Sequence, residues 1–191
     1  MEIERRFFDS EVRASEDTKK VKGYGSVFGK RSEDLGGFQE IIAEGAFDGR
    51  LRDDVRALFN HDQNIVLGRT KSGTLDLSID EKGLRYEVDF PDTQQARDLL
   101  VTIKRGDVDQ SSFAFTVAHD GDEITEIDGV LIRTIHKIKR LYDVSPVTYP
   151  AYPDTTVGAR SIKEFLKARS ISKGALEAHR DRLEQLKNPR W

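Results

Sequence analysis

Residues 74–90 read TLDLSIDEKGLRYEVDF and carry the strongest signal for the fold class. Apolar and polar residues alternate in both halves, and a period of two is typical of half-buried strands. The connection DEKG, residues 80–83, is a turn-type sequence. The stretch therefore predicts a β-hairpin with strands at 74–79 and 84–90, and a protein built mainly of strands.

The rest of the chain extends this mainly β pattern with few helices. Further strands are expected at residues 1–8, 20–28, 55–60, 111–117 and 129–140. A helix is expected from Asp92, as its N-cap, to Gly106, with apolar residues at helical spacing at Ala96, Leu99, Leu100 and Ile103. The acidic residues 120–128 predict a connection with a short strand at most, and helical turns are expected at 43–51 and after Pro153. Together these elements indicate an α+β protein dominated by strands.

The amino-acid composition and motifs argue against several classes of functional site. The 191 residues include no cysteine, which excludes disulfides, thiolate zinc sites and a cysteine nucleophile. The four histidines form no HxxxH or HExxH pattern, and no GxxxxGK[ST] loop occurs, so neither a metal nor a nucleotide cofactor is expected. No apolar run approaches the roughly 18 residues of a membrane span. The first ten residues, MEIERRFFDS, are too charged for a signal peptide.

Charge divides the chain into two pieces. The formal net charge is −3, but residues 160–191 carry nine Lys/Arg against four Asp/Glu and are therefore +5, which leaves residues 1–159 at −8. The sequence predicts a body, residues 1–159, and a basic tail, residues 160–191. Apolar stripes in the tail predict amphipathic helices at 161–168 and 172–186.

Two residues are candidates for chemistry on pattern alone. His61 ends the apolar strand VRALFN, where a general base would have a fixed position and access to water; the alternative is a histidine that caps the loop. Ser112 lies in SSFAFTV on the face opposite Phe113 and Phe115, where a substrate could lie; the alternative is the polar face of an edge strand. His136 is expected within a strand.

Four segments link these candidates. They are GYGSVFGK (23–30), ALFNHDQNIVLGRT (57–70), KRGDVDQSSFAFTV (104–117) and LYDVSPVTYPAYPDT (141–155). In this order and spacing they resemble the phage prohead (capsid maturation) proteases of the HK97 type, serine peptidases related in fold to herpesvirus assemblins. The resemblance spans roughly residues 20–158, nearly the whole body.

The resemblance implies a role for each matched residue. His61 matches the family's histidine, Ser112 the nucleophile before Phe-Ala-Phe, and Asp143 the acidic position before Val-Ser. Ser111 is the neighbouring alternative to Ser112. His136 is the alternative to Asp143, because assemblins use a Ser-His-His arrangement. Backbone N–H groups are expected to form the oxyanion hole, and the pattern does not distinguish Arg133 from Arg140 as an additional donor.

The resemblance also implies a setting and a fold. We expect a small β-barrel with peripheral helices and a helical C-terminal tail, acting as a serine endopeptidase inside the assembling procapsid in the host cytoplasm. Its expected substrates are the scaffolding segment of the major capsid protein and the protease itself, with self-cleavage somewhere after Asp154. Assemblins dimerise through a helix, so a homodimer is compatible with the resemblance, and nucleic acid is not an expected partner. The alternative is a catalytically silent scaffold or capsid-interaction module, with the tail as its docking element.

Overall fold

The computed structural model describes residues 3–8, 12–16, 18–35, 37–149, 162 and 165–167. The chain divides into two compact units, Met1–Asp154 and Thr155–Trp191. In the second unit, residues 162 and 165–167 are helical. The rest of the two predicted tail helices, and the predicted boundary at residue 159, lie outside the described residues.

The described part of the first unit is mainly β, and its largest sheet has five strands in the order β1-β9-β12-β5-β6. The pairing is antiparallel except between β12 and β5, which run parallel. The strands, in sheet order, are β1 (Glu4–Phe8), β9 (Gln110–Val117), β12 (Ile138–Val147), β5 (Arg56–Phe59) and β6 (Asp62–Arg69).

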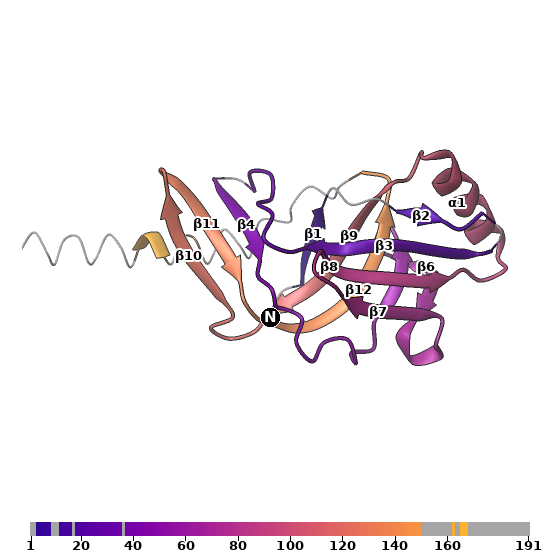
Figure 1. Cartoon of the computed structure of the whole chain (residues 1–191), viewed down its shortest axis with the longest axis horizontal. Helices are drawn as coiled ribbons and strands as arrows, with labels where there is room; N and C mark the ends of the chain where they lie inside the picture. Colours follow the sequence, from indigo (N-terminus) through magenta and orange to yellow (C-terminus); the bar gives the residue numbers. More distant parts are fainter. Residues whose placement is uncertain are drawn as a thin grey trace, which may run out of the picture. The chain divides into compact units, whose positions relative to one another are not determined.

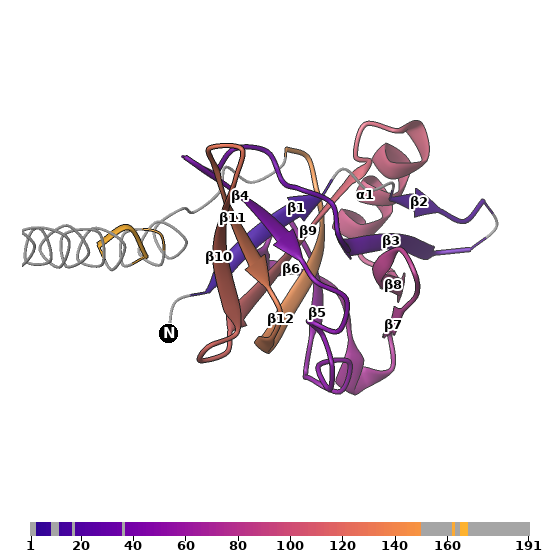
Figure 2. The ribbon, with the colours of Figure 1, turned by 60° about the vertical axis from the view of Figure 1, so that its left-hand side comes forward.

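Two smaller sheets flank this one. The four-stranded sheet contains, in order, β2 (Arg13–Ala14), β3 (Lys20–Val27), β8 (Gly83–Asp89) and β7 (Leu75–Ile79). The three-stranded sheet contains β10 (Asp122–Ile127), β11 (Val130–Ile135) and β4 (Phe38–Ile42). A 3-10 turn, η1 (Thr70–Ser72), follows β6. In Figures 1 and 2, the three-stranded sheet lies at one end of the unit and the four-stranded sheet toward the other.

The strand-dominated α+β class is confirmed, whereas the closed barrel is not. The described strands form three separate open sheets. The predicted hairpin at 74–90 is present as β7 and β8, with Leu75 opposite Val88 and both buried. Phe113 and Phe115 are fully buried and stack at 4.6 Å between ring centroids, as their common face on β9 predicted.

The single α-helix of this unit among the described residues is α1 (Gln94–Arg105). It buries Ala96, Leu99 and Ile103, at the predicted helical spacing. Its N-cap is Thr93, whose hydroxyl accepts the Ala96 N–H, and not the predicted Asp92. The prediction was one residue early because both are good caps. Gly106 ends the helix in the left-handed conformation, with φ of 83°.

The predicted strand at 129–140 is wrong, because two strands occupy this region. β11 ends at Ile135, and the N–H groups of His136 and Lys137 both donate to the Gly121 carbonyl before β12 begins. The acidic connection forms the six-residue β10, joined to β11 through Asp128 and Gly129, both with positive φ. An Asp-Gly pair between two strands is a signal for a type I′ hairpin, and this hairpin was not predicted.

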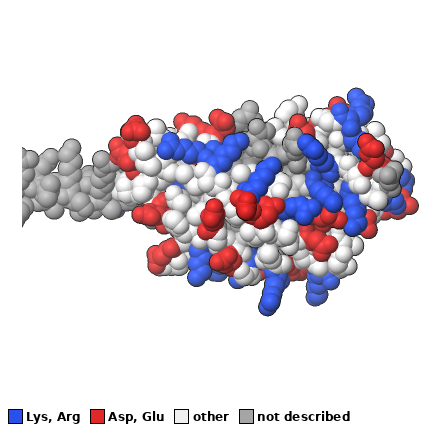
Figure 3. Space-filling view, viewed as in Figure 1, with Lys and Arg blue, Asp and Glu red and all other residues white. Residues whose placement is uncertain are grey.

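Charges of both signs are interspersed on the face shown in Figure 3. Ion pairs between strands include those of Lys20 and Lys22 with Glu87. Among the described residues, no helix is long and apolar enough to cross a membrane.

Candidate active site

His61 is positioned by a tight turn between β5 and β6. Phe59 pairs with Asp62, so Asn60 and His61 form a two-residue loop, and their φ values of 52° and 58° are those of a type I′ turn. Asparagine and histidine both adopt this left-handed conformation more often than most residues other than glycine. Asn60 fastens the turn to the end of β12: its N–H donates to the Pro146 carbonyl, and its side chain exchanges two hydrogen bonds with Thr148. The turn that carries His61 is therefore held by the end of β12 as well as by its own two strands.

Ser112 lies in the interior of the five-stranded sheet. Its neighbours across β9 are Phe7 of β1 and Ser145 of β12. The Ser112 side chain is completely buried, and its Oγ lies 2.7 Å from His61 Nε2 and 2.9 Å from the Arg6 carbonyl oxygen. The reading of this segment as an exposed edge strand is wrong, because β9 has a neighbour on each side.

Ser111 faces the opposite side of the same strand. Its Oγ lies 2.8 Å from the phenol oxygen of Tyr86 in β8, and both residues are fully buried. Burial raises the pKa of Tyr86, so its hydroxyl stays protonated and can donate. This contact joins the five-stranded sheet to the four-stranded one. Of the two neighbouring serines, only Ser112 is within reach of His61.

Asp143 completes a line of three side chains. Its Oδ1 lies 2.6 Å from His61 Nδ1 and accepts the hydroxyl of Ser145 at 2.8 Å. The side chains of His61 and Asp143 are 7% and 10% exposed, so the line is nearly closed to water. Ser145 was not predicted as a site residue from the sequence. It follows Asp143 by two residues on a strand, and its side chain therefore lies on the same face.

The contacts of His61 accommodate two protonation states of its imidazole ring. With neutral His61 carrying its proton on Nδ1, that proton is donated to Asp143, and Nε2 accepts the Ser112 hydroxyl. With His61 protonated on both nitrogens, Nε2 donates to Ser112 Oγ, and the hydroxyl proton turns to the Arg6 carbonyl. The contacts of Ser112 Oγ can therefore be satisfied with His61 either neutral or protonated.

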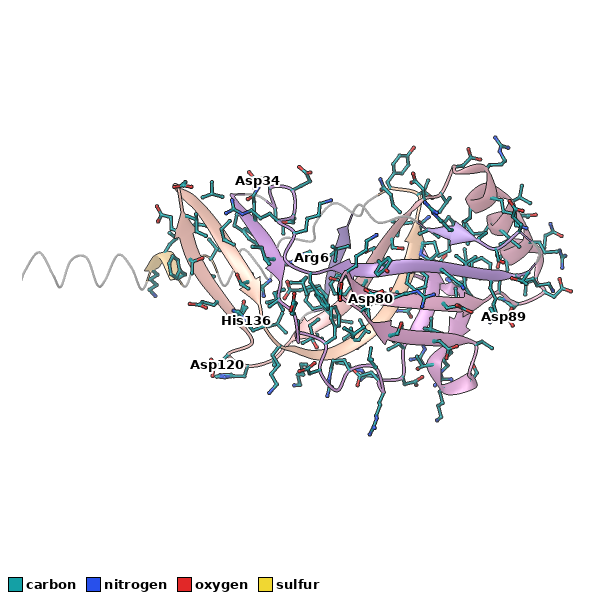
Figure 4. All side chains as sticks on the ribbon, in the orientation of Figure 1. Arg6, Asp34, Asp80, Asp89, Asp120 and His136 are labelled. Atoms are coloured by element: carbon teal, nitrogen blue, oxygen red, sulfur yellow. The ribbon has the colours of Figure 1, made fainter. Side chains whose placement is uncertain are left out.

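The other histidines and arginines considered from the sequence are engaged elsewhere. His136 lies between β11 and β12, 51% exposed and 3.6 Å from Glu123, and Figure 4 shows it near Asp120 at the end of the three-stranded sheet. Arg133 is fully buried among carboxylates, and Arg140 lies over the Tyr142 ring. The structure thus brings Asp143, and not His136, to His61.

A buried ion cluster anchors β1 beside Ser112. It consists of Glu4, Arg6, Glu40 and Arg133, each at most 3% exposed, with Asp122 at its rim. Ion pairs of 2.6–3.0 Å join these side chains across β1, β4 and β11. Arg6 is labelled at the centre of Figure 4. The residue whose carbonyl contacts Ser112 Oγ is therefore fixed through its own side chain.

A pocket of about 390 Å³ opens beside His61 and Asp143. Its lining includes Arg5, Arg56 and Ala114. Among the described residues, no group of three or more His, Asp or Glu side chains is arranged to hold a metal ion.

One comparison with known proteins identifies relatives. A family model described as caudovirus prohead serine protease matches residues 8–168, most of the chain. The search of curated proteins gave no match, and neither did the search of solved structures. The matched range contains His61, Ser112 and Asp143, as the resemblance of the four sequence segments led us to expect.

Proposed function

Because the chain belongs to the caudovirus prohead serine protease family, we propose that it is a serine endopeptidase with Ser112 as nucleophile, His61 as general base and Asp143 as the carboxylate that orients His61. The observation that carries this proposal is the unbroken line of short contacts, 2.7 Å from Ser112 Oγ to His61 Nε2 and 2.6 Å from His61 Nδ1 to Asp143 Oδ1. Serine, histidine and a carboxylate in this relation are the parts of a Ser-His-acid mechanism.

The proposed reaction follows from these contacts. Ser112 Oγ attacks the scissile carbonyl carbon while its proton passes to His61 Nε2, and Asp143 stabilises the resulting imidazolium through Nδ1–H. The cation then gives the proton to the leaving amine, and the C–N bond breaks to leave an acyl-enzyme on Ser112. Water, deprotonated by the same nitrogen, hydrolyses the ester and restores the serine.

The substrates proposed are the scaffolding segment of the major capsid protein and the protease itself, inside the assembling procapsid. The family is one of phage capsid maturation, which supports capsid proteins as the interacting class. We further propose that the basic residues 160–191 dock the enzyme to the shell or scaffold. Deleting residues 161–191 should then impair packaging into the shell more than cleavage itself, and the reverse result would discard the docking role.

Coexpression with the capsid protein tests the proposal. Intact mass of both proteins should show processing by the wild type and no processing by Ser112→Ala. Ser111→Ala is the matched control, because this neighbour faces Tyr86 on the other side of β9. Processing that persists in Ser112→Ala would show that Ser112 is not the nucleophile.

One observation favours a second candidate, a catalytically silent capsid-interaction module. Ser112 is 0% exposed, and a serine without access to a substrate cannot turn over. The two candidate functions predict different masses for the capsid protein during assembly. A protease whose site opens on assembly cleaves the capsid protein within proheads, whereas the module leaves every mass unchanged throughout assembly.

A further inference from the structure

Four residues form a row across one face of the five-stranded sheet. Arg5 of β1 pairs in register with Ala114 of β9, Ala114 with Asp143 of β12, and Asp143 with Arg56 of β5. Residues that pair in register direct their side chains to the same face, and all four line the pocket beside His61. The row therefore has an arginine at each end, and the small Ala114 between Arg5 and Asp143 leaves open space next to Arg5.

The charge of this row is unbalanced. The one carboxylate in the row belongs to Asp143, and it already forms hydrogen bonds with His61 and Ser145. Arg56 contacts Asp54 at 3.4 Å and donates to its carbonyl. Arg5 differs: it is half-buried, its Nε is buried without a hydrogen-bond partner, and no carboxylate of the described residues pairs with its guanidinium.

An unpaired guanidinium at a pocket is a site for an anion. Burying a charge without a partner is unfavourable, and the arginine fork suits a carboxylate. Ala114 follows Ser112 by two residues on the same face, which places the pocket about 7 Å along the strand from the serine. A substrate whose scissile carbonyl lies at Ser112 would therefore put a side chain into the pocket within two residues of the bond.

We propose that this pocket takes an acidic side chain of the substrate, Asp or Glu, and that Arg5 is the specificity-determining residue that pairs with it. The inference rests on the proposed protease function and names its substrate class. The same carboxylate chemistry is also present at the C-terminus of a peptide, so the test separates the two sources.

Processing of the capsid protein by the full chain gives the first readout. New termini are sequenced, and we expect Asp or Glu within two residues of each cleaved bond. Changing that residue to Asn or Gln should slow processing about tenfold or more in the wild type, because it removes a charged hydrogen bond. In Arg5→Met the same substrate change should cost less than about threefold, since the partner is already absent.

Two variants sharpen this readout. Arg97→Met removes an exposed arginine of α1 and should discriminate between the substrates like the wild type. Arg5→Glu should prefer a substrate with Lys at the acidic position. Cleaved bonds without a nearby acidic residue, or tenfold discrimination retained in Arg5→Met, would overturn the inference while leaving the protease function intact.

Binding to the Ser112→Ala chain separates the two proposals. Overlapping peptides from the scaffolding segment are amidated at the C-terminus and measured by fluorescence anisotropy, with Glu or Asp compared to Gln or Asn. Arg5-dependent preference for the acidic peptides supports the pocket even if the wild type cleaves nothing, in which case the protease function alone fails. Binding that requires a free C-terminus would assign the site to a chain end and overturn the side-chain proposal.

Discussion

Replacing Arg133 with methionine removes one of the two cations that neutralise the buried ion cluster. In the wild type, the guanidinium of Arg133 donates to both oxygens of Glu4, to Glu40 at 3.0 Å and to Asp122 at 2.6 Å. Burial disfavours its charged form, but the hydrogen bonds and charges of these carboxylates outweigh burial and raise its pKa. Arg133 is therefore a permanent cation, whose loss leaves Glu4 and Glu40 sharing Arg6.

The expected cost follows from this imbalance. Removing one partner of a buried ion pair typically destabilises a protein by about 3–5 kcal/mol, because the charge left behind is neither paired nor hydrated. For a domain of this size, that cost corresponds to a fall in melting temperature of about 6–20 °C. Urea unfolding followed by circular dichroism measures the change directly, provided that the transition is two-state.

Two further variants make the measurement decisive. Arg85→Met removes a surface arginine 3.7 Å from Glu87 and should cost at most about 1 kcal/mol. Adding Glu40→Gln to Arg133→Met removes one uncompensated carboxylate, so the double variant should be more stable than the sum of the single costs implies. A loss no larger for Arg133→Met than for Arg85→Met, or strict additivity in the double variant, would refute the view that charge balance holds this cluster together.

Three other outcomes are expected. Asp143→Asn should slow capsid processing by about 10⁴-fold, whereas His136→Ala should change it little; the reverse pattern would assign the third position to His136. Ser145→Ala should lower the processing rate by about tenfold with little effect on the melting temperature, because it removes a hydrogen bond that orients Asp143, and an unchanged rate would deny it that role. Thr93→Ala should reduce the free energy of unfolding by about 1 kcal/mol through loss of the α1 cap, and no change would rule out this cap.

Local patterns were sufficient where the structure is local. The alternation in residues 74–90 predicted β7 and β8, and the apolar spacing after Asp92 predicted α1, because each depends on contacts within one short segment. β4 was missed, since residues 38–42 form a strand only by pairing in parallel with β11, far along the chain.

The candidate site depends on distant segments. His61, Ser112 and Asp143 lie on separate strands, and no periodicity within one segment could bring them together; the resemblance of the four motifs did so. The contact of Ser112 with the Arg6 carbonyl involves a backbone atom, which a pattern of side chains does not reveal. The left-handed backbone of His61 was not predicted either, although Asn60 before it was a signal for a left-handed turn.

The central place of Ser112 in its sheet has a consequence for the order of events during synthesis. Its hydroxyl contacts a residue 106 positions earlier in the chain, and His61 contacts one 82 positions later. A nascent chain that ends before β12 contains the serine and the histidine but neither Asp143 nor one of the two strands that enclose β9. Since long-range pairings form slowly and only after all their strands exist, the three side chains can align only after nearly the whole first unit has been made.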